Sequence, residues 1–328
     1  MKTISATQTS NLYGRFNPLN DYLFVKVMGE KGDEVQLLGF LNAVLDRTGN
    51  DRLASVEIIE SKTFSAETLG DKSSILDVRA MLQDGTMVNI EVQLRNLGNM
   101  DRRSLFYWSK EFTKGIKAGQ DYRELPNAIA INIINFQFLE TENFHTVFHL
   151  REDNEHSLVL TDALEIHFLD MVKYRRQQRT VRPKVCGRRK DMENEPLHRW
   201  LAWLDENSPP ELIAEVVGTD DTIKAAQERL VYVTGDDEAI RAYEMRQMAL
   251  SDLTSYKNFA REEGLKEGRE EGIKQGLKQG LEQGLEQGIE QGIEKNRVET
   301  ARKMKLRGRP IDEIAEDTGL SIETIKEL

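Results

Sequence analysis

The chain has 328 residues and carries 45 lysines and arginines against 56 aspartates and glutamates, a formal net charge of −11 at pH 7. No apolar run approaches the ~20 residues of a membrane-spanning helix, which excludes an integral membrane protein. The N-terminus lacks the apolar stretch of a secretion signal, and the single Cys186 can form no internal disulfide, so we expect a cytoplasmic protein. The acidic composition, taken alone, argues against nucleic acid as a partner.

Helix and strand patterns alternate in the first half of the chain. Residues 21–27 and 33–45 are predicted to be helices, and the second carries one apolar face, formed by Val35, Leu38, Leu41 and Leu45. A short strand is expected at 56–59. Two alternating segments, 74–82 and 86–94, then predict a β-hairpin.

A strand–helix–strand unit is expected to follow the hairpin. Residues 101–118 have apolar side chains at helical spacing, and residues 128–136 form the near-continuous apolar run of a strand buried on both faces. After residue 190 the pattern is helical, with Leu197, Trp200, Leu201 and Leu204 on one face. We expect an α/β domain over 1–190, a helical region over 191–260, a glycine-repeat linker or helical arm over 261–296, and a small helical hairpin over 297–328.

The predicted hairpin carries the clearest candidate chemistry. In the second strand, Glu91 and Gln93 lie on the face opposite Val92, and the first strand contains Asp77. A two-residue turn would point Asp77 toward the apolar face. A three-residue loop ending at Gly85 pairs residue 82 with residue 86 and places Asp77 directly opposite Glu91, and only this register keeps each face consistently polar or apolar.

Two carboxylates in directly opposed positions repel each other, and a divalent cation would turn that repulsion into binding. Mg²⁺ suits such a pair, because it is held by one or two carboxylates together with water and phosphate oxygens. The alternative is a solvated hairpin face on which Arg79 and Arg95 neutralise the acids. Spacing alone leaves both interpretations open.

Further segments extend the pattern beyond the hairpin. They are the opening Asn17-Pro18-Leu19-Asn20-Asp21-Tyr22-Leu23-Phe24-Val25-Lys26, the strand Ile75-Leu76-Asp77-Val78-Arg79-Ala80, the strand Asn89-Ile90-Glu91-Val92-Gln93, and Arg103, Tyr107, Gly119, Tyr122 and Pro126. Together they resemble the PD-(D/E)xK nuclease superfamily, and within it the Rpn-type family of recombination-promoting nucleases and transposases. The resemblance covers about residues 15–190.

The resemblance implies a restriction-endonuclease-like α/β core, a mixed sheet flanked by helices, with an α-helical C-terminal extension. It implies hydrolysis of DNA phosphodiesters with Mg²⁺, or Mn²⁺, held by Asp77, Glu91 and the backbone carbonyl of Val92. Gln93 takes the place of the superfamily's lysine, and Asp21 is a further acid that the first helix could bring to the metal. Since glutamine is neutral, we expect weak or conditional activity.

A basic stretch follows the expected core. Residues 171–190 contain nine lysines and arginines and no acid, which makes them candidates for phosphate contacts or, alternatively, a solvated loop paired with later acidic helices. The residues singled out for DNA binding are Arg175, Arg176, Arg179, Arg182, Lys184, Arg188 and Arg189. Two other basic side chains, His145 and His149, lack the adjacent glutamate of a zinc-protease motif, so we expect surface or packing histidines.

Glycine recurs every fourth residue from Gly264 to Gly292, usually followed by Leu or Ile. A four-residue step makes the apolar stripe drift around a helix, and the intervening Glu, Gln and Lys argue against a membrane helix. We expect a partly helical linker or an arm for homo-oligomerisation. Residues 310–321 then resemble half of a helix-turn-helix, although Glu323 and Glu327 favour a packing hairpin over a DNA reader.

The sequence therefore favours a Mg²⁺-dependent DNA endonuclease that acts in recombination or transposition of mobile DNA. A non-catalytic DNA-binding or assembly protein that retains the fold is the main alternative, and an RNA-processing nuclease is a third.

Overall fold

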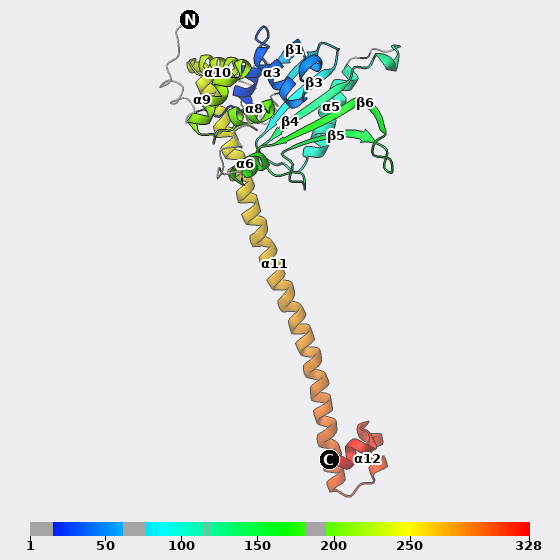
Figure 1. Ribbon diagram of the computed structural model, residues 1–328. Coiled ribbons are helices and arrows are strands. Elements are labelled where there is room, and N and C mark those ends of the chain that lie inside the picture. Colours follow the sequence, from blue (N-terminus) through cyan, green and yellow to red (C-terminus); the bar gives the residue numbers. More distant parts are fainter. Residues whose placement is uncertain (1–15, 62–76, 115, 117–118, 181–194) are drawn as a thin grey trace. The chain divides into compact units, whose positions relative to one another are not determined.

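The computed structural model describes residues 16–61, 77–114, 116, 119–180 and 195–328 (Figure 1). The chain divides into two compact units, Met1–Ser251 and Asp252–Leu328, which are described separately. Within the described residues, no helix has both the length and the apolar character needed to cross a bilayer.

A mixed sheet forms the centre of the first unit, and its described strands run in the order β1-β2-β3-β4-β6-β5. The strands are β1 (Val56–Ser61), β2 (Asp77–Leu82), β3 (Met87–Gln93), β4 (Ala128–Ile134), β5 (His145–Arg151) and β6 (Val159–Asp170). β1, β2 and β3 pair antiparallel, β4 is parallel to both β3 and β6, and β5 is antiparallel to β6. This confirms the expected α/β class and its mixed sheet flanked by helices.

Helices cover both faces of this sheet (Figure 1). The helix α5 (Met100–Lys114) packs on one face, where Met100 joins Ala130 and Ile134 of β4 in a small apolar cluster. The opposite face carries the main core, with α2, α3, α6, α8, α9 and α10 around it. Their bounds are α2 (Asp21–Met28), α3 (Val35–Val44), α6 (Met171–Thr180), α8 (Pro196–Leu204), α9 (Pro210–Thr219) and α10 (Asp221–Val233), and two short 3₁₀ turns lie at Gly49–Asp51 and Tyr122–Glu124.

The β2–β3 turn has the three-residue geometry that the sequence favoured. The Leu82 N–H donates to the Thr86 carbonyl over 2.9 Å, and Gly85 adopts φ = +86°, a left-handed conformation that suits glycine. As a result, Asp77 pairs with Glu91 and Arg79 with Asn89. The register prediction is confirmed.

The helices α8, α9 and α10 share the core of the sheet and belong to the same compact unit. Trp200 of α8 is fully buried and packs edge-to-face on Phe40 of α3, with ring centroids 5.6 Å apart. α10 contacts both α2 and α3. An apolar face on α8 cannot be buried without α3, which is why these helices belong to the same unit as the sheet.

The helix α11 (Asp237–Leu306) contains the boundary between the two units and includes the whole glycine repeat. In the second unit, its last turns pack on α12 (Ile311–Thr318) and α13 (Ile322–Glu327) around Ala301, Ile314, Leu320 and Ile325. Gly319 ends α12 at φ = +68°, and the Ser321 side chain caps α13 by accepting from the Thr324 N–H. These elements lie in the segment 297–328, where the sequence predicts a helical hairpin.

Candidate active site

The candidate site lies on the sheet face beneath α5. The backbone of Asp77 is described and its side chain is not, so its placement rests on the ladder position opposite Glu91. The Glu91 residue is only 1% exposed. A solvated hairpin face, the alternative left open by the sequence, is therefore excluded for Glu91, and likewise for Asn89, which is 2% exposed.

The Glu91 carboxylate is held by donors from two elements. Its Oε1 atom accepts a 2.8 Å hydrogen bond from Gln93 Nε2 on the same strand face. It also accepts from Arg103 of α5, through Nε at 2.6 Å and Nη2 at 2.5 Å. The guanidinium carbon of Arg103 lies 5.3 Å from the ring centroid of Tyr107 one turn further along α5.

A second ion pair joins the hairpin to α5 with the opposite polarity. Arg79 of β2 pairs with Glu111 of α5, and both side chains are less than one-tenth exposed. Positions 103 and 111 are about two turns apart, so both face the sheet. An acid of the hairpin, Glu91, thus pairs with an arginine of α5, and an arginine of the hairpin, Arg79, pairs with an acid of α5.

The Val92 carbonyl points toward β2. The Met87 N–H and the Gln93 carbonyl both bond to the β4 side, to Asn127 and Asn135 respectively. Because neighbouring strand residues bond to opposite sides, the N–H and C=O of Val92 face β2, whose described part ends at Asp77. The carbonyl expected as a metal ligand therefore lies beside the Asp77–Glu91 pair.

Asp21 is nearly buried at the start of α2 and has partners of its own. Its Oδ1 accepts from the Tyr22 N–H at 3.0 Å, and its Oδ2 accepts from Arg246 of α11 at 2.7 and 2.5 Å. Among the described contacts of Asp21, none involves the β2–β3 hairpin.

The donor set is consistent with a hard divalent cation, because two carboxylates and a carbonyl offer only oxygen. Among the side chains that the structure describes, no three of His, Cys, Asp or Glu are grouped so that they could hold a metal, and the side chain of Asp77 is not among those described.

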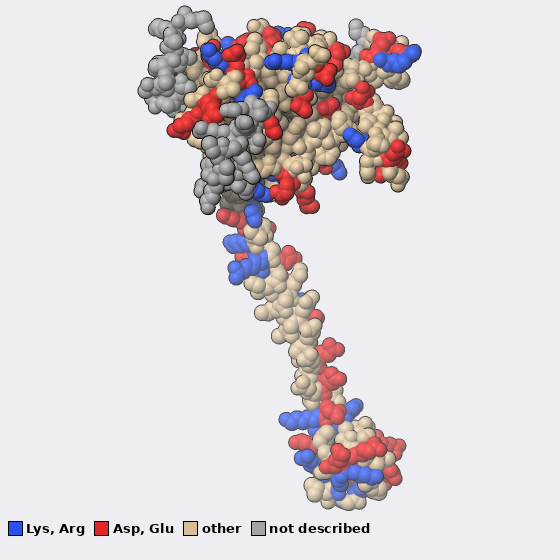
Figure 2. Space-filling view, in the orientation of Figure 1, with Lys and Arg blue, Asp and Glu red and all other residues tan. Residues whose placement is uncertain are grey.

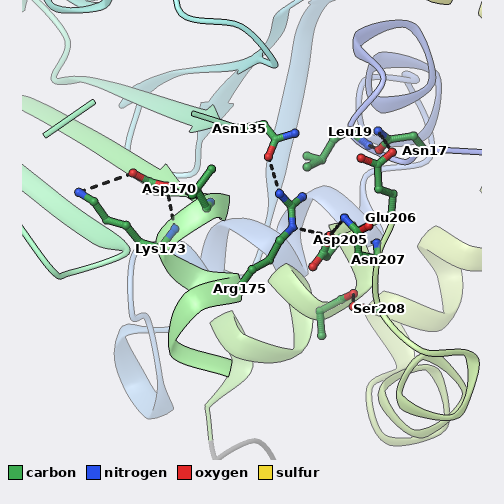
Figure 3. A network of polar contacts seen from close by, with 12 residues as sticks. Asn17, Leu19, Asn135, Asp170, Lys173, Arg175, Asp205, Glu206, Asn207 and Ser208 are labelled. Carbon is green, nitrogen blue, oxygen red and sulfur yellow. Dashed lines mark hydrogen bonds and ion pairs between the residues drawn. The ribbon is translucent and has the colours of Figure 1, made fainter. Parts of the chain in front are cut away.

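The described part of the basic stretch is engaged with the protein itself (Figure 3). Arg175 donates to Asp205 Oδ1 at 2.8 Å and to Asn135 Oδ1 at 2.6 Å, and Lys173 donates to the Leu139 carbonyl at 2.7 Å. Arg176 is half-exposed, 3.9 Å from Glu142. The side chain of Arg179, and Arg182, Lys184, Arg188 and Arg189, lie outside the described residues.

This network adjoins the candidate site at the carboxyl ends of the parallel strands. Asn135 follows β4, and its N–H donates to the Gln93 carbonyl over 3.0 Å. Arg175 is thus two contacts from Gln93. On the face shown in Figure 2, the described lysines and arginines lie among acidic side chains.

Sequence reasoning missed a polar network on β5 and β6. His145 Nε2 lies 2.9 Å from His167 Nδ1, and His167 Nε2 lies 2.5 Å from Glu165 Oε1. Burial and the neighbouring His167 lower the pKa of His145 to about 4, and the hydrogen bond from His167 lowers the pKa of Glu165. No spacing signal links these residues, because they occupy two strands that were not predicted.

Comparison with known proteins gives one family. The family described as PD-(D/E)XK nuclease family transposase matches residues 18–260, which include the whole described sheet and the helices α2 to α10. Neither the curated proteins nor the solved structures gave a match. The match covers well over half of the chain. The chain belongs to the PD-(D/E)XK nuclease family transposases.

Proposed function

We propose that this chain is a metal-dependent DNA endonuclease that acts in recombination or transposition of mobile DNA, with Asp77, Glu91 and the Val92 carbonyl as ligands for Mg²⁺ or Mn²⁺. The observation that carries the proposal is the register of β2 on β3, which pairs Asp77 with the buried Glu91. Residues in such positions have Cβ atoms roughly 4.5–5.5 Å apart, a spacing that two ligands of one cation can share.

When bound, the cation would polarise the scissile phosphate and lower the pKa of a water molecule. The chain's own residues do the rest. Arg103 and Gln93 fix the rotamer of Glu91 by donating to one of its oxygens. The Gln93 amide oxygen can orient a water by accepting a hydrogen bond, but an amide cannot take up the proton.

The proposal keeps DNA as the substrate and the stretch 171–190 as a contact to its phosphates. Arg176, half-exposed on α6, is the described member most available for such a contact. Arg179, Arg182, Lys184, Arg188 and Arg189 remain proposals from the sequence. Arg175 would act less directly, because Asp205 and Asn135 already bind its guanidinium, and Asn135 in turn contacts the Gln93 backbone.

Asp77→Ala is expected to reduce Mg²⁺-dependent nicking of supercoiled DNA at least a hundredfold, because one of two carboxylate ligands is lost. Asp77→Asn, which retains the shape of the side chain, should lose activity comparably. The matched control is Glu57→Ala, which removes an exposed acid from β1 of the same sheet and should cleave normally.

Nicking by Asp77→Ala at the wild-type rate would refute the site. The rival interpretation is a DNA-binding or assembly protein that retains the fold, and the neutral Gln93 favours it. Calorimetric titration with Mn²⁺ separates the nuclease from this rival. The nuclease should bind Mn²⁺ through Asp77, and the rival need not. An RNA substrate offered in parallel tests the remaining alternative.

A further inference from the structure

The positive charge nearest to Glu91 comes from a helix rather than from the strand. Arg103 Nε and Nη2 lie 2.6 and 2.5 Å from Glu91 Oε1, although the two residues are twelve positions apart in sequence. The Arg103 side chain is 17% exposed and the Glu91 side chain is 1% exposed. This ion pair is therefore shielded from water, where its charges act more strongly than at a surface.

The strand supplies no cation at the corresponding place. By the resemblance of the hairpin to the PD-(D/E)XK motif, Gln93 takes the place of the lysine, and its amide donates to the same Glu91 Oε1 atom over 2.8 Å. One carboxylate oxygen thus receives a neutral donor from β3 and a cationic donor from α5.

Arg79, a further described arginine of the hairpin face, has a different counterion. Arg79 pairs with Glu111 of α5, so much of its charge is compensated away from Glu91. Arg103 has Glu91 itself as its counterion, and α5 and the ring of Tyr107 restrict its position. An arginine also stays protonated at every physiological pH.

We propose that Arg103 is a positioning residue that supplies from α5 the positive charge which lysine supplies from the strand in the PD-(D/E)XK motif. This inference rests on the proposed function. By holding Oε1, Arg103 sets the orientation in which Glu91 meets a cation. Its charge also offsets negative charge that develops at the phosphate during hydrolysis.

Arg103→Met removes the charge and keeps a long apolar side chain on α5. We expect nicking to fall about a hundredfold, the usual effect of losing one preorganised donor. Mn²⁺ affinity, measured by calorimetry, should rise about tenfold, because a cation that repels the metal has gone while Gln93 still holds the same Glu91 oxygen. A purely structural role for Arg103 predicts weaker Mn²⁺ binding, since Glu91 would lose its support.

The decisive variant is the double substitution Arg103→Met with Gln93→Lys. It moves the charge from α5 back to the strand, so nicking should recover to within about tenfold of wild type. Arg103→Lys, which retains the charge, should keep more activity than Arg103→Met. Arg102→Met, an exposed neighbour on α5, is the matched control and should change neither nicking nor Mn²⁺ affinity.

The outcomes separate this inference from the proposed function. If wild type nicks DNA and Asp77→Ala does not, normal nicking by Arg103→Met overturns the role of Arg103 alone. A well-folded double variant that fails to recover overturns it as well. If wild type neither nicks DNA nor binds Mn²⁺, the proposed function fails, and the role of Arg103 fails with it.

Discussion

His145, His167 and Glu165 form a hydrogen-bonded chain whose proton positions follow from chemistry. A carboxylate only accepts, so the His167 Nε2 atom carries the proton that lies against Glu165. In neutral His167 the Nδ1 atom must then accept, and His145 donates to it through Nε2. Protonating His145 would place a positive charge in a partly buried site beside His167, which is why the folded chain resists it.

This network makes the stability of the fold depend on pH. The pKa of His145 falls from an ordinary 6.5 to about 4 in the folded chain, through burial and His167, while the charges of Glu165 and Asp46 act in the opposite direction. Between pH 6.5 and 4 the unfolded chain binds the extra proton, so the free energy of unfolding decreases as pH falls. We expect a loss of about 2 kcal/mol between pH 7 and 5, measured by denaturant unfolding.

The comparison variant is His145→Gln, which keeps a donor on β5 and cannot titrate. Its loss of stability between pH 7 and 5 should be smaller than that of wild type. The Glu165 carboxylate adds little to the change between pH 7 and 5. Its pKa is lowered in the folded chain, so the stability that it contributes is lost only as the pH falls below the ordinary glutamate value of 4.5. Equal losses in the two proteins would contradict the assignment.

Single residues of the site were predictable where they share a hairpin. The pairing of Asp77 with Glu91 follows from turn length and alternation, both local properties. The contact of Arg103 with Glu91 was not predictable in this way, although Arg103 belongs to the segments that resemble the family. Which face of α5 meets the sheet depends on how the helix crosses it, and helical periodicity leaves that orientation open.

At the scale of elements, α5 is fixed to the hairpin by charges as well as by apolar contacts. Glu111→Gln would leave Arg79 with a buried charge and a neutral partner. Breaking a buried pair from one side typically costs 3–5 kcal/mol, so we expect the free energy of unfolding to fall by about 3 kcal/mol. Equilibrium denaturation followed by fluorescence measures this, since Trp108 of α5 donates to the Ala128 carbonyl of β4.

A double variant distinguishes charge from shape. Replacing both Arg79 and Glu111 by methionine removes the pair and its desolvation cost together, and should recover most of the lost stability. Arg123→Met, which breaks the exposed pair with Asp121, should leave the unfolding midpoint unchanged. A Glu111→Gln variant as stable as wild type would show that Glu111 is not needed to stabilise the buried charge of Arg79.

The elements that the sequence did not predict are those without a clear apolar face. Several apolar side chains of β5 and β6 are exposed, among them Val147, Phe148 and Leu150, so alternation does not coincide with burial. The glycine repeat presents the opposite case. Each glycine disfavours a helix by about 1 kcal/mol relative to alanine, yet the whole repeat lies within α11, with its leucines and isoleucines exposed. In Figure 2, residues other than Lys, Arg, Asp and Glu make up much of the visible surface of α11.

At the scale of the whole first unit, the fold depends on contacts between segments far apart in sequence. Gly39 of α3 packs on Thr222 of α10, a position that composition and charge blocks could not reveal. The charge boundary near residue 190 suggested an α/β domain followed by a helical region. In the structure the tryptophans of α8 join the core formed by α3 and the sheet. Apolar periodicity predicted that these helices have a buried face, but it does not identify the surface that buries it.

Gly39→Ala tests whether this unit folds as one body. A Cβ at Gly39 would lie 2.1 Å from Thr222 Oγ1 and 2.4 Å from its Cβ, so α3 and α10 must separate. We expect the free energy of unfolding to fall by about 1–3 kcal/mol, the usual cost of overpacking. Denaturation should remain a single transition, with the same midpoint at Trp108 as at Trp200 and Trp203. Tryptophan-to-phenylalanine variants separate the fluorescence signals of these residues. Gly218→Ala in α9, where a Cβ meets nothing within 4 Å, should stabilise slightly instead. If Gly39→Ala shifts the transition seen by Trp200 and Trp203 but not that seen by Trp108, the helices unfold independently of the sheet, and a domain boundary near residue 190 is correct after all.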